Sequence, residues 1–255
     1  FDFTRASSAT VVNKDGLIET VGSGKARIDF KDDAKGALLL EPSRTNLIQY
    51  SESFDNAYWT KSGSSVTSGF VSPKGDLSAF KLTEDTSNGE HKITRLVLTT
   101  NQRSEASFFV KSNGRNKVVL SMGTTTFQST FDLSNGTFIN DGDSLGSIES
   151  LKNDWYKISI NSSYFSATDV YATIKLLNNS NNVSYIGDGT SGIYLFGAQL
   201  EQGSYATSYI PTQAGAVTRV ADSSSQTPPI GIIGQTEGTM FLNIKRGVQI
   251  NNTQG

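Results

Sequence analysis

The sequence offers a single residue for chemistry that depends on histidine. His91 is the only histidine in the 255 residues. A His-Glu-x-x-His zinc site needs two histidines, so that class of site is excluded. A Ser-His-Asp triad would have to use His91, which stands at the start of a predicted strand. We therefore predict that His91 is a surface residue at the beginning of a strand and not a catalytic base.

Paired carboxylates are the next candidates, because glycoside hydrolases use one carboxyl group as acid and another as nucleophile or base. Asp141 and Asp143 form one such pair, and Glu84 and Asp85 form another. Both pairs lie in turn-forming segments, where Asp favours the backbone geometry in any case. We interpret them as solvated loop acids. A structural calcium ion at Asp141 and Asp143 is the alternative, since hard cations bind clustered oxygen ligands, and the sequence indicates no other cofactor.

Aromatic rings are what sugar binding needs, because the apolar face of a pyranose stacks on a ring while its hydroxyl groups meet polar side chains. Trp59 and Trp155 lie among apolar neighbours in strand-like segments, and we predict that both pack in the core. Four other rings lie beside polar loops, where partial exposure is expected. These candidate ligand-binding residues are Phe127, Tyr164, Phe165 and Tyr185.

Composition narrows the function classes further. Charged residues make up 18% of the chain, and Ser, Thr, Asn and 24 glycines fill the difference; these residues disfavour long helices. The net charge of −2 argues against a nucleic-acid partner. Without cysteine there is neither a disulfide framework nor a thiolate metal site. No apolar run is as long as a bilayer-spanning helix requires, so we expect no transmembrane segment, and we expect no signal peptide.

The elements that would position these residues are short strands. Alternating apolar runs recur every ten to fifteen residues or so, and turn signals such as Asn-Gly separate them. Nothing alternates between strand and helix as a parallel sheet requires, and Ser51–Phe54 is the one place where a short helical turn is plausible. The stretch from Tyr185 to Thr212 is predicted to hold the last core strand, with Tyr205 and Tyr209 closing the fold. The sequence thus predicts an all-β chain, an antiparallel jelly-roll β-sandwich.

The domain organisation follows from changes in composition. We predict a β-rich leader or lid over 1–40, the jelly-roll sandwich over 41–212 and a linker over 213–237, where Ala, Ser, Thr and Pro accumulate. Residues 238–255 alternate as a fresh strand and are interpreted as the start of a second β domain or fibre segment. Because the first residue is Phe1, we expect the chain to be a piece of a longer protein.

Several motifs, taken together in order, resemble a known family. The runs Arg44-Thr45-Asn46-Leu47, Tyr58-Trp59 and Gly197-Ala198-Gln199-Leu200-Glu201 are similar to modules of bacteriophage tail-fibre and head-spike proteins. Those modules look like carbohydrate-binding jelly rolls, and a laminin-G or concanavalin-A-like domain often follows them. The resemblance covers roughly residues 3–222. It implies a virion structural protein with a glycan-binding fold, and its matched residues look structural.

Three functions remain open at this level. The first is a non-enzymatic fibre or spike module that attaches the virion to a host-surface glycan, used outside the cell and made in the host cytoplasm. Its expected partners are other virion proteins and the glycan, in a homo-oligomer for which a trimer is favoured. The second is a purely structural spacer or decoration domain that contacts other virion proteins. A polysaccharide depolymerase is the third and weakest, because it requires a carboxylate pair in a groove.

Overall fold

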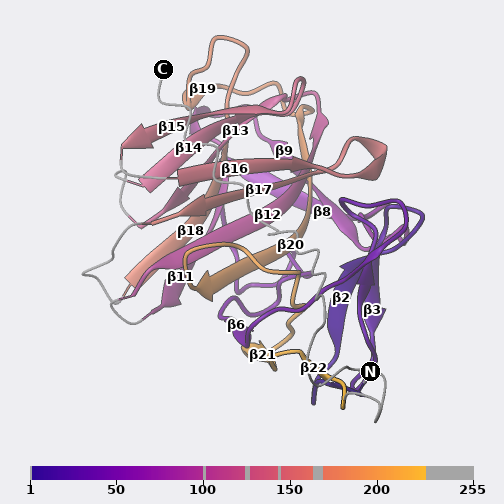
Figure 1. Cartoon of the computed structure of the whole chain (residues 1–255). Coiled ribbons are helices and arrows are strands. Elements are labelled where there is room, and N and C mark those ends of the chain that lie inside the picture. Colours follow the sequence, from indigo (N-terminus) through magenta and orange to yellow (C-terminus); the bar gives the residue numbers. More distant parts are fainter. Residues whose placement is uncertain (1, 100–101, 124–126, 143–144, 163–168, 228–255) are drawn as a thin grey trace.

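The computed structural model describes residues 2–99, 102–123, 127–142, 145–162 and 169–227. Two six-stranded antiparallel sheets dominate it (Figure 1). The first, here the β13 sheet, has the strand order β15-β14-β13-β18-β11-β7. Its strands are β7 (Thr60–Ser62), β11 (Lys92–Leu98), β13 (Lys117–Met122), β14 (Phe127–Asp132), β15 (Thr137–Gly142) and β18 (Asp169–Leu176).

The second sheet, here the β12 sheet, has the order β16-β17-β12-β20-β9-β8. Its strands are β8 (Ser64–Phe70), β9 (Ala79–Glu84), β12 (Ser104–Asn113), β16 (Leu145–Ser150), β17 (Tyr156–Asn161) and β20 (Gly192–Gln202). At both edges the chain passes from one sheet directly to the other, through β7 and β8 on one side and β15 and β16 on the other. The predicted antiparallel jelly-roll β-sandwich is therefore confirmed.

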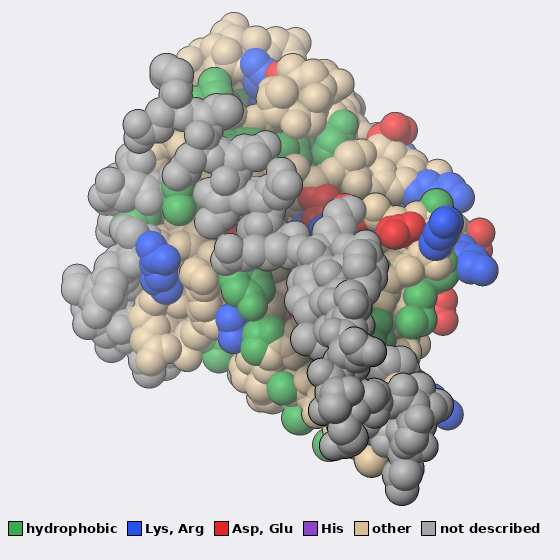
Figure 2. Space-filling view, viewed as in Figure 1, with side chains coloured by type: hydrophobic (Ala, Val, Ile, Leu, Met, Phe, Trp, Pro, Cys, Tyr) green, Lys and Arg blue, Asp and Glu red, His purple; other side chains and the backbone are tan. Residues whose placement is uncertain are grey.

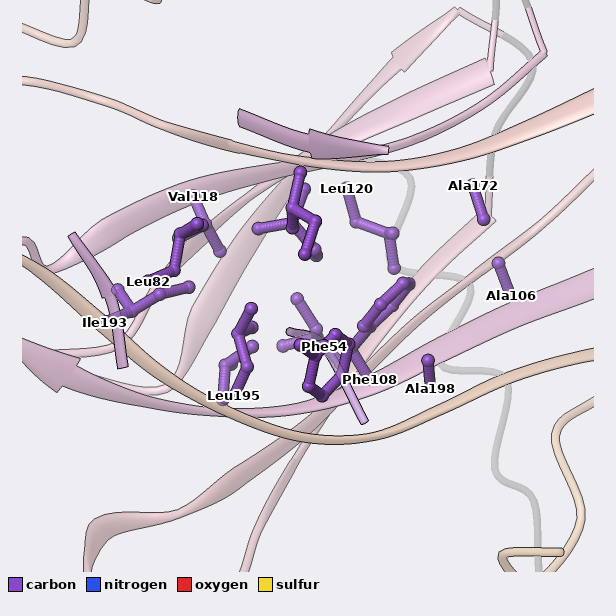
Figure 3. Close-up of a cluster of buried hydrophobic side chains, with 14 of the residues drawn as sticks. Phe54, Leu82, Ala106, Phe108, Val118, Leu120, Ala172, Ile193, Leu195 and Ala198 are labelled. Atoms are coloured by element: carbon purple, nitrogen blue, oxygen red, sulfur yellow. The ribbon is translucent and has the colours of Figure 1, made fainter. Parts of the chain in front are cut away.

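The core lies between the two sheets. Figure 3 shows Val118, Leu120 and Ala172 of the β13 sheet facing Leu82, Phe108 and Leu195 of the β12 sheet. Trp59 and Trp155 are 2% and 1% exposed, as predicted. Trp59 packs against Phe54 and Phe108 in this core, whereas Trp155 belongs to a second cluster with Phe109, Phe196 and Tyr209.

β20 contains the apolar run that the sequence marks as the last core strand, and it pairs with β12 and β9 in the middle of its sheet. At Gly197 the register with β12 shifts, and the φ of +57° there is one that glycine adopts without strain. After β20 the chain turns back across the outer face of the sheet. There Tyr209 is buried against Phe109 and Phe196, and its hydroxyl group hydrogen-bonds the Ser51 hydroxyl at 2.7 Å.

The remaining strands are short and form two-stranded pairs. They are β1 (Asp2–Thr4) with β22 (Ser223–Ser225), β2 (Ala9–Val12) with β3 (Ile18–Val21), β4 (Ile28–Asp29) with β5 (Ala37–Leu38), β6 (Arg44–Asn46) with β21 (Val217–Arg219), and β10 (Asn88–Glu90) with β19 (Ser184–Ile186). Figure 1 shows β2, β3, β6, β21 and β22 below the two sheets. One 3₁₀ turn, η1 (Lys152–Asp154), is the only helical element of the described residues, and Ser51–Phe54 forms turns.

A buried charge network, here the arginine clasp, ties the leader to residues near 220. Arg5 and Arg27 both pair with Asp222, and Arg27 and Arg219 both pair with Glu41. Burial raises the pKa of Glu41 and of Asp222, but the facing arginines and their hydrogen bonds outweigh it and hold both pKa values below the usual range. Asp222 and β22 thus contact the leader, and they lie within the segment where the sequence indicates a linker.

The domain boundaries themselves stay a prediction, and the expected strand over 238–255 lies outside the described residues. On the face seen in Figure 2, acidic and basic side chains of the described part of the chain are intermixed, and no extended area carries one sign. No helix among these residues has the length and apolar character needed to cross a bilayer.

Candidate ligand-binding site

The structure describes two of the four aromatic residues predicted to bind a ligand, and these two lie on different strands. Tyr185 is only 7% exposed, so the expected partial exposure is wrong for this residue. Its hydroxyl group donates a hydrogen bond to Glu84 at 2.7 Å, and its ring lies against His91. Phe127 is half-buried on β14 and packs against the main core. Tyr164 and Phe165 lie outside the described residues.

One of the two residues predicted as calcium ligands lies among the described residues. Asp141 lies on β15, where its carboxylate accepts a hydrogen bond from Gln128 at 2.5 Å. Asp143 lies outside the described residues. Among the residues that the structure describes, no group of three or more His, Cys, Asp or Glu side chains is arranged to hold a metal ion. The calcium ion therefore stays a prediction.

His91 is not a surface residue as predicted, because its side chain is fully buried. Its Nδ1 lies 2.5 Å from the Gly63 carbonyl oxygen, and its Nε2 lies 3.1 Å from the Tyr185 carbonyl oxygen. Both ring nitrogens thus face the backbone of neighbouring loops. We infer that His91 holds these loops together and takes no part in catalysis.

Glu84 and Asp85 do not form a catalytic pair either. Glu84 is buried at the end of β9, where Arg115 holds its carboxylate through two hydrogen bonds, one of them 2.7 Å long. Although burial raises its pKa, the hydrogen bonds from Arg115, Asp188 and Tyr185 lower it more. Asp85 is exposed and binds the Ser87 backbone. The interpretation of Glu84 as a solvated loop acid is therefore wrong, because its side chain forms a buried ion pair that fixes this end of the sandwich.

A hollow of about 150 Å³ lies where β6 meets the end of β20. We call it the Arg44 hollow. Its lining is polar apart from one leucine, and it contains hydroxyl, amide and guanidinium groups but no carboxylate among the described residues. The lining residues are Ser43, Arg44, Thr45, Leu47 and Gln202. A smaller hollow of about 50 Å³ lies on the other side of β21, lined in part by Val217 and Thr218.

The position of the hollow follows from how β6 is anchored. Asn46 is fully buried, and its amide nitrogen donates hydrogen bonds to the carbonyl oxygens of Ala198 and Ile210 at 3.0 and 2.9 Å. Leu47 extends the attachment, since its backbone N–H donates to the Leu200 carbonyl oxygen. Asn46 is the buried end of β6, whereas Arg44 and Thr45 before it are only partly buried.

Arg44 has few partners for a guanidinium group. Its Nη1 donates one hydrogen bond of 3.2 Å, to the Ser43 carbonyl oxygen, and its Nε is buried without any partner among the described residues. The guanidinium carbon lies 5.3 Å from the centre of the half-buried Tyr205 ring, a cation–π contact. Gly203 makes this arrangement possible, because a Cβ atom there would come within 2.9 Å of the Arg44 Nη2.

Sequence reasoning missed Arg44 and Tyr205 as binding residues. Arg44 belongs to the run Arg44-Thr45-Asn46-Leu47, which the sequence marks only as a family feature. The signal that separates Arg44 from the clasp arginines is the lack of a carboxylate partner. The sequence does not reveal which arginines have a carboxylate partner, because partners can lie far apart in the chain: Arg27 and Asp222 are 195 positions apart.

Comparison with known proteins gives no sequence-level relative. No described protein family matches the chain, and no curated protein matches it. Solved structures with some likeness include a module designated TmCBM61, in complex with β-1,4-galactotriose. That likeness has 9% identity, covers 62% of this chain and 99% of that one, and has a TM-score of 0.40.

A xylan-binding CBM22-1 domain of Paenibacillus barcinonensis Xyn10C is 15% identical over 64% of this chain and 94% of that one, with a TM-score of 0.34. The enzymatically active domain of tailspike protein 4 of bacteriophage CBA120 is 15% identical over 61% of this chain, with a TM-score of 0.38. In that case the chain spans only 21% of the other protein's length. Identities this low carry no residue roles to this chain.

Proposed function

We propose that this chain is a non-enzymatic glycan-binding β-sandwich, used by a virion fibre or spike for attachment to a host surface. The observation that carries the glycan-binding part is the Arg44 hollow. Hydroxyl, amide and guanidinium groups converge there, and the Tyr205 ring stands beside Arg44. A sugar offers hydroxyl groups to such polar groups and an apolar ring face to an aromatic side chain.

The virion role rests on the family resemblance of the sequence and not on the hollow. A glycan-binding module of this kind needs no catalytic carboxylates, and none of the described residues that line the hollow is acidic. Glycans displayed many times on a surface also suit a protein that presents several copies of a weak site, because multivalent contact multiplies modest affinities. A homo-oligomeric fibre, with a trimer as the favoured state, supplies that multiplicity.

A purely structural spacer is the second candidate, and a specific surface favours it. Ile28 and Leu38 lie opposite each other on β4 and β5 and are 44% and 45% exposed, and Leu40 is 50% exposed. An exposed apolar group of this kind is typical of a contact with another protein. The spacer function would leave the Arg44 hollow without a ligand.

A glycan array probed with the whole chain tests the proposal. We expect binding to at least one host polysaccharide class, and we expect Tyr205→Ala to weaken it. Tyr171→Ala is the matched control, because Tyr171 is 46% exposed on the β13 sheet, away from the lining of the hollow. Absence of binding by the wild-type chain, or equal weakening by both variants, contradicts the proposed glycan-binding function.

A further inference from the structure

Four arginines of the described residues, Arg5, Arg27, Arg115 and Arg219, each form an ion pair with a carboxylate. Arg44 forms none with any described residue, and neither does Arg95, whose Nη1 donates to the Tyr58 carbonyl oxygen instead. The single described acceptor of Arg44 is the Ser43 carbonyl oxygen, at 3.2 Å. A guanidinium group presents five N–H donors in a planar fork that matches a carboxylate through two parallel hydrogen bonds. Arg44 therefore retains most of its donor capacity.

The unused donors of Arg44 are held in place instead of moving freely in solvent. The Arg44 Nε is buried, and the guanidinium group packs beside Gly203. The guanidinium carbon lies 5.3 Å from the centre of the Tyr205 ring. A side chain fixed in this way loses less conformational entropy when a ligand binds than a free surface arginine does. Arg44 is thus a preorganised cation at the wall of the hollow.

No described acidic side chain lines the hollow, so none of the described lining residues competes for this cation. The other lining groups suit a sugar: Ser43 and Thr45 carry hydroxyl groups, and the Thr45 hydroxyl lies 2.8 Å from that of Thr218. The hollow combines one fixed positive charge with uncharged hydrogen-bonding groups. An acidic sugar residue has the complementary set, one carboxylate and several hydroxyl groups.

We propose that the Arg44 hollow selects acidic glycans, with the carboxylate of a uronic or sialic acid residue accepting hydrogen bonds from the Arg44 guanidinium group. This inference rests on the proposed glycan-binding function and adds the class of sugar. Arg44 sets the specificity, and Ser43, Thr45 and Gln202 meet the hydroxyl groups. The ion pair forms at the surface, so its strength falls as salt concentration rises.

An array of matched glycan pairs tests the inference, each acidic glycan standing beside its methyl-esterified or carboxyl-reduced counterpart. We expect the wild-type chain to bind at least one acidic member about tenfold or more tightly than its neutral counterpart, as a charge-assisted bidentate contact provides. This preference should shrink between 50 and 500 mM NaCl, where screening shortens to a few ångströms. Arg44→Gln should abolish it, and Arg44→Lys should retain only part of it.

Arg95→Gln is the matched control. Arg95 also stacks on a tyrosine, with its guanidinium carbon 3.7 Å from the centre of the Tyr58 ring, but it does not line the hollow. Equal binding of acidic and neutral members overturns this inference and leaves the proposed function standing. An acidic preference that survives in Arg44→Gln also overturns it. Binding to neither member of any pair contradicts the inference and the proposed function together.

Discussion

Glu105 and Glu201 lie directly opposite each other on the neighbouring strands β12 and β20, and both are buried. Their side chains project from the outer face of the β12 sheet. Their chain neighbours Ala106 and Leu200 point the other way, into the core between the sheets. Glu201 accepts hydrogen bonds from Thr207 in the segment that crosses this face. The Glu105 Oε2 has no hydrogen-bond partner among the described residues.

This pair predicts a loss of stability as pH rises. Burial, and to a smaller degree the charge of Glu201, raises the pKa of Glu105 from 4.5 to about 7, and burial also raises the pKa of Glu201. The folded state therefore binds protons more tightly than the unfolded state. The stability from Glu105 is fully present below pH 4.5 and is lost as pH rises to about 7.

Each pKa unit corresponds to roughly 1.4 kcal/mol, so the Glu105 contribution is on the order of 3 kcal/mol. Thermal unfolding followed by circular dichroism between pH 4.5 and 8 measures it. Glu105→Gln should flatten the decline, since Gln cannot ionise. Glu149→Gln is the control, because Glu149 is paired with Lys31 at a partly exposed site. The charge of Lys157 acts on both carboxyl groups, and that of Arg219 acts on Glu201. A decline of stability with pH that is the same in Glu105→Gln as in wild type would show that groups other than Glu105 cause it.

The arginine clasp predicts that the leader and the segment near residue 220 stabilise each other. Asp222→Ala leaves Arg5 buried without its carboxylate and Arg27 with Glu41 alone. Removing one partner of a buried ion pair costs about 3–5 kcal/mol. Denaturant unfolding measures the change. Lys31→Ala, which breaks a partly exposed pair, should cost at most about 1 kcal/mol. If Asp222→Ala and Lys31→Ala lower the free energy of unfolding by similarly small amounts, residues 213–227 behave as the linker that the sequence indicates.

The shift in register at Gly197 predicts a penalty for any side chain there. An added Cβ atom would meet Phe109 at 2.9 Å and Tyr209 at 3.1 Å, at a φ that L-residues rarely adopt. Gly197→Ala should therefore destabilise the fold by about 1–3 kcal/mol. Gly215→Ala should be neutral or slightly stabilising, because nothing lies within 4 Å of its added Cβ atom. A melting temperature of Gly197→Ala equal to that of wild type would refute the packing described at this position.

The fold was predictable from the sequence because it depends on local patterns. Alternating apolar residues and turn signals indicate the strands, and both tryptophans stand among apolar neighbours that place them in the core. Burial of polar residues was not predictable in this way. Tyr185, Glu84 and Arg115 look like loop residues one by one, and only the meeting of β9, β19 and the turn between β12 and β13 brings them together.

The candidate site escaped prediction for the same reason. Arg44 matters because no carboxylate among the described residues pairs with it, whereas Arg27 and Arg219 lie against Glu41. These pairings join residues 14 and 178 positions apart in the chain. The residue types that a sequence offers for sugar binding are exposed aromatic rings, but exposure depends on which segments cross each sheet face.

The Arg44 hollow is the glycan-binding site that we propose for this protein. NMR titration of the isotopically labelled chain with the glycan that binds best on the array tests this claim most directly. We predict chemical-shift changes at the Arg44 Nε–H and at the amides of Thr45, Gln202 and Tyr205, with Tyr171 unchanged. Shift changes that map to the outer face of the β13 sheet and leave the Arg44 signals unmoved would contradict the claim.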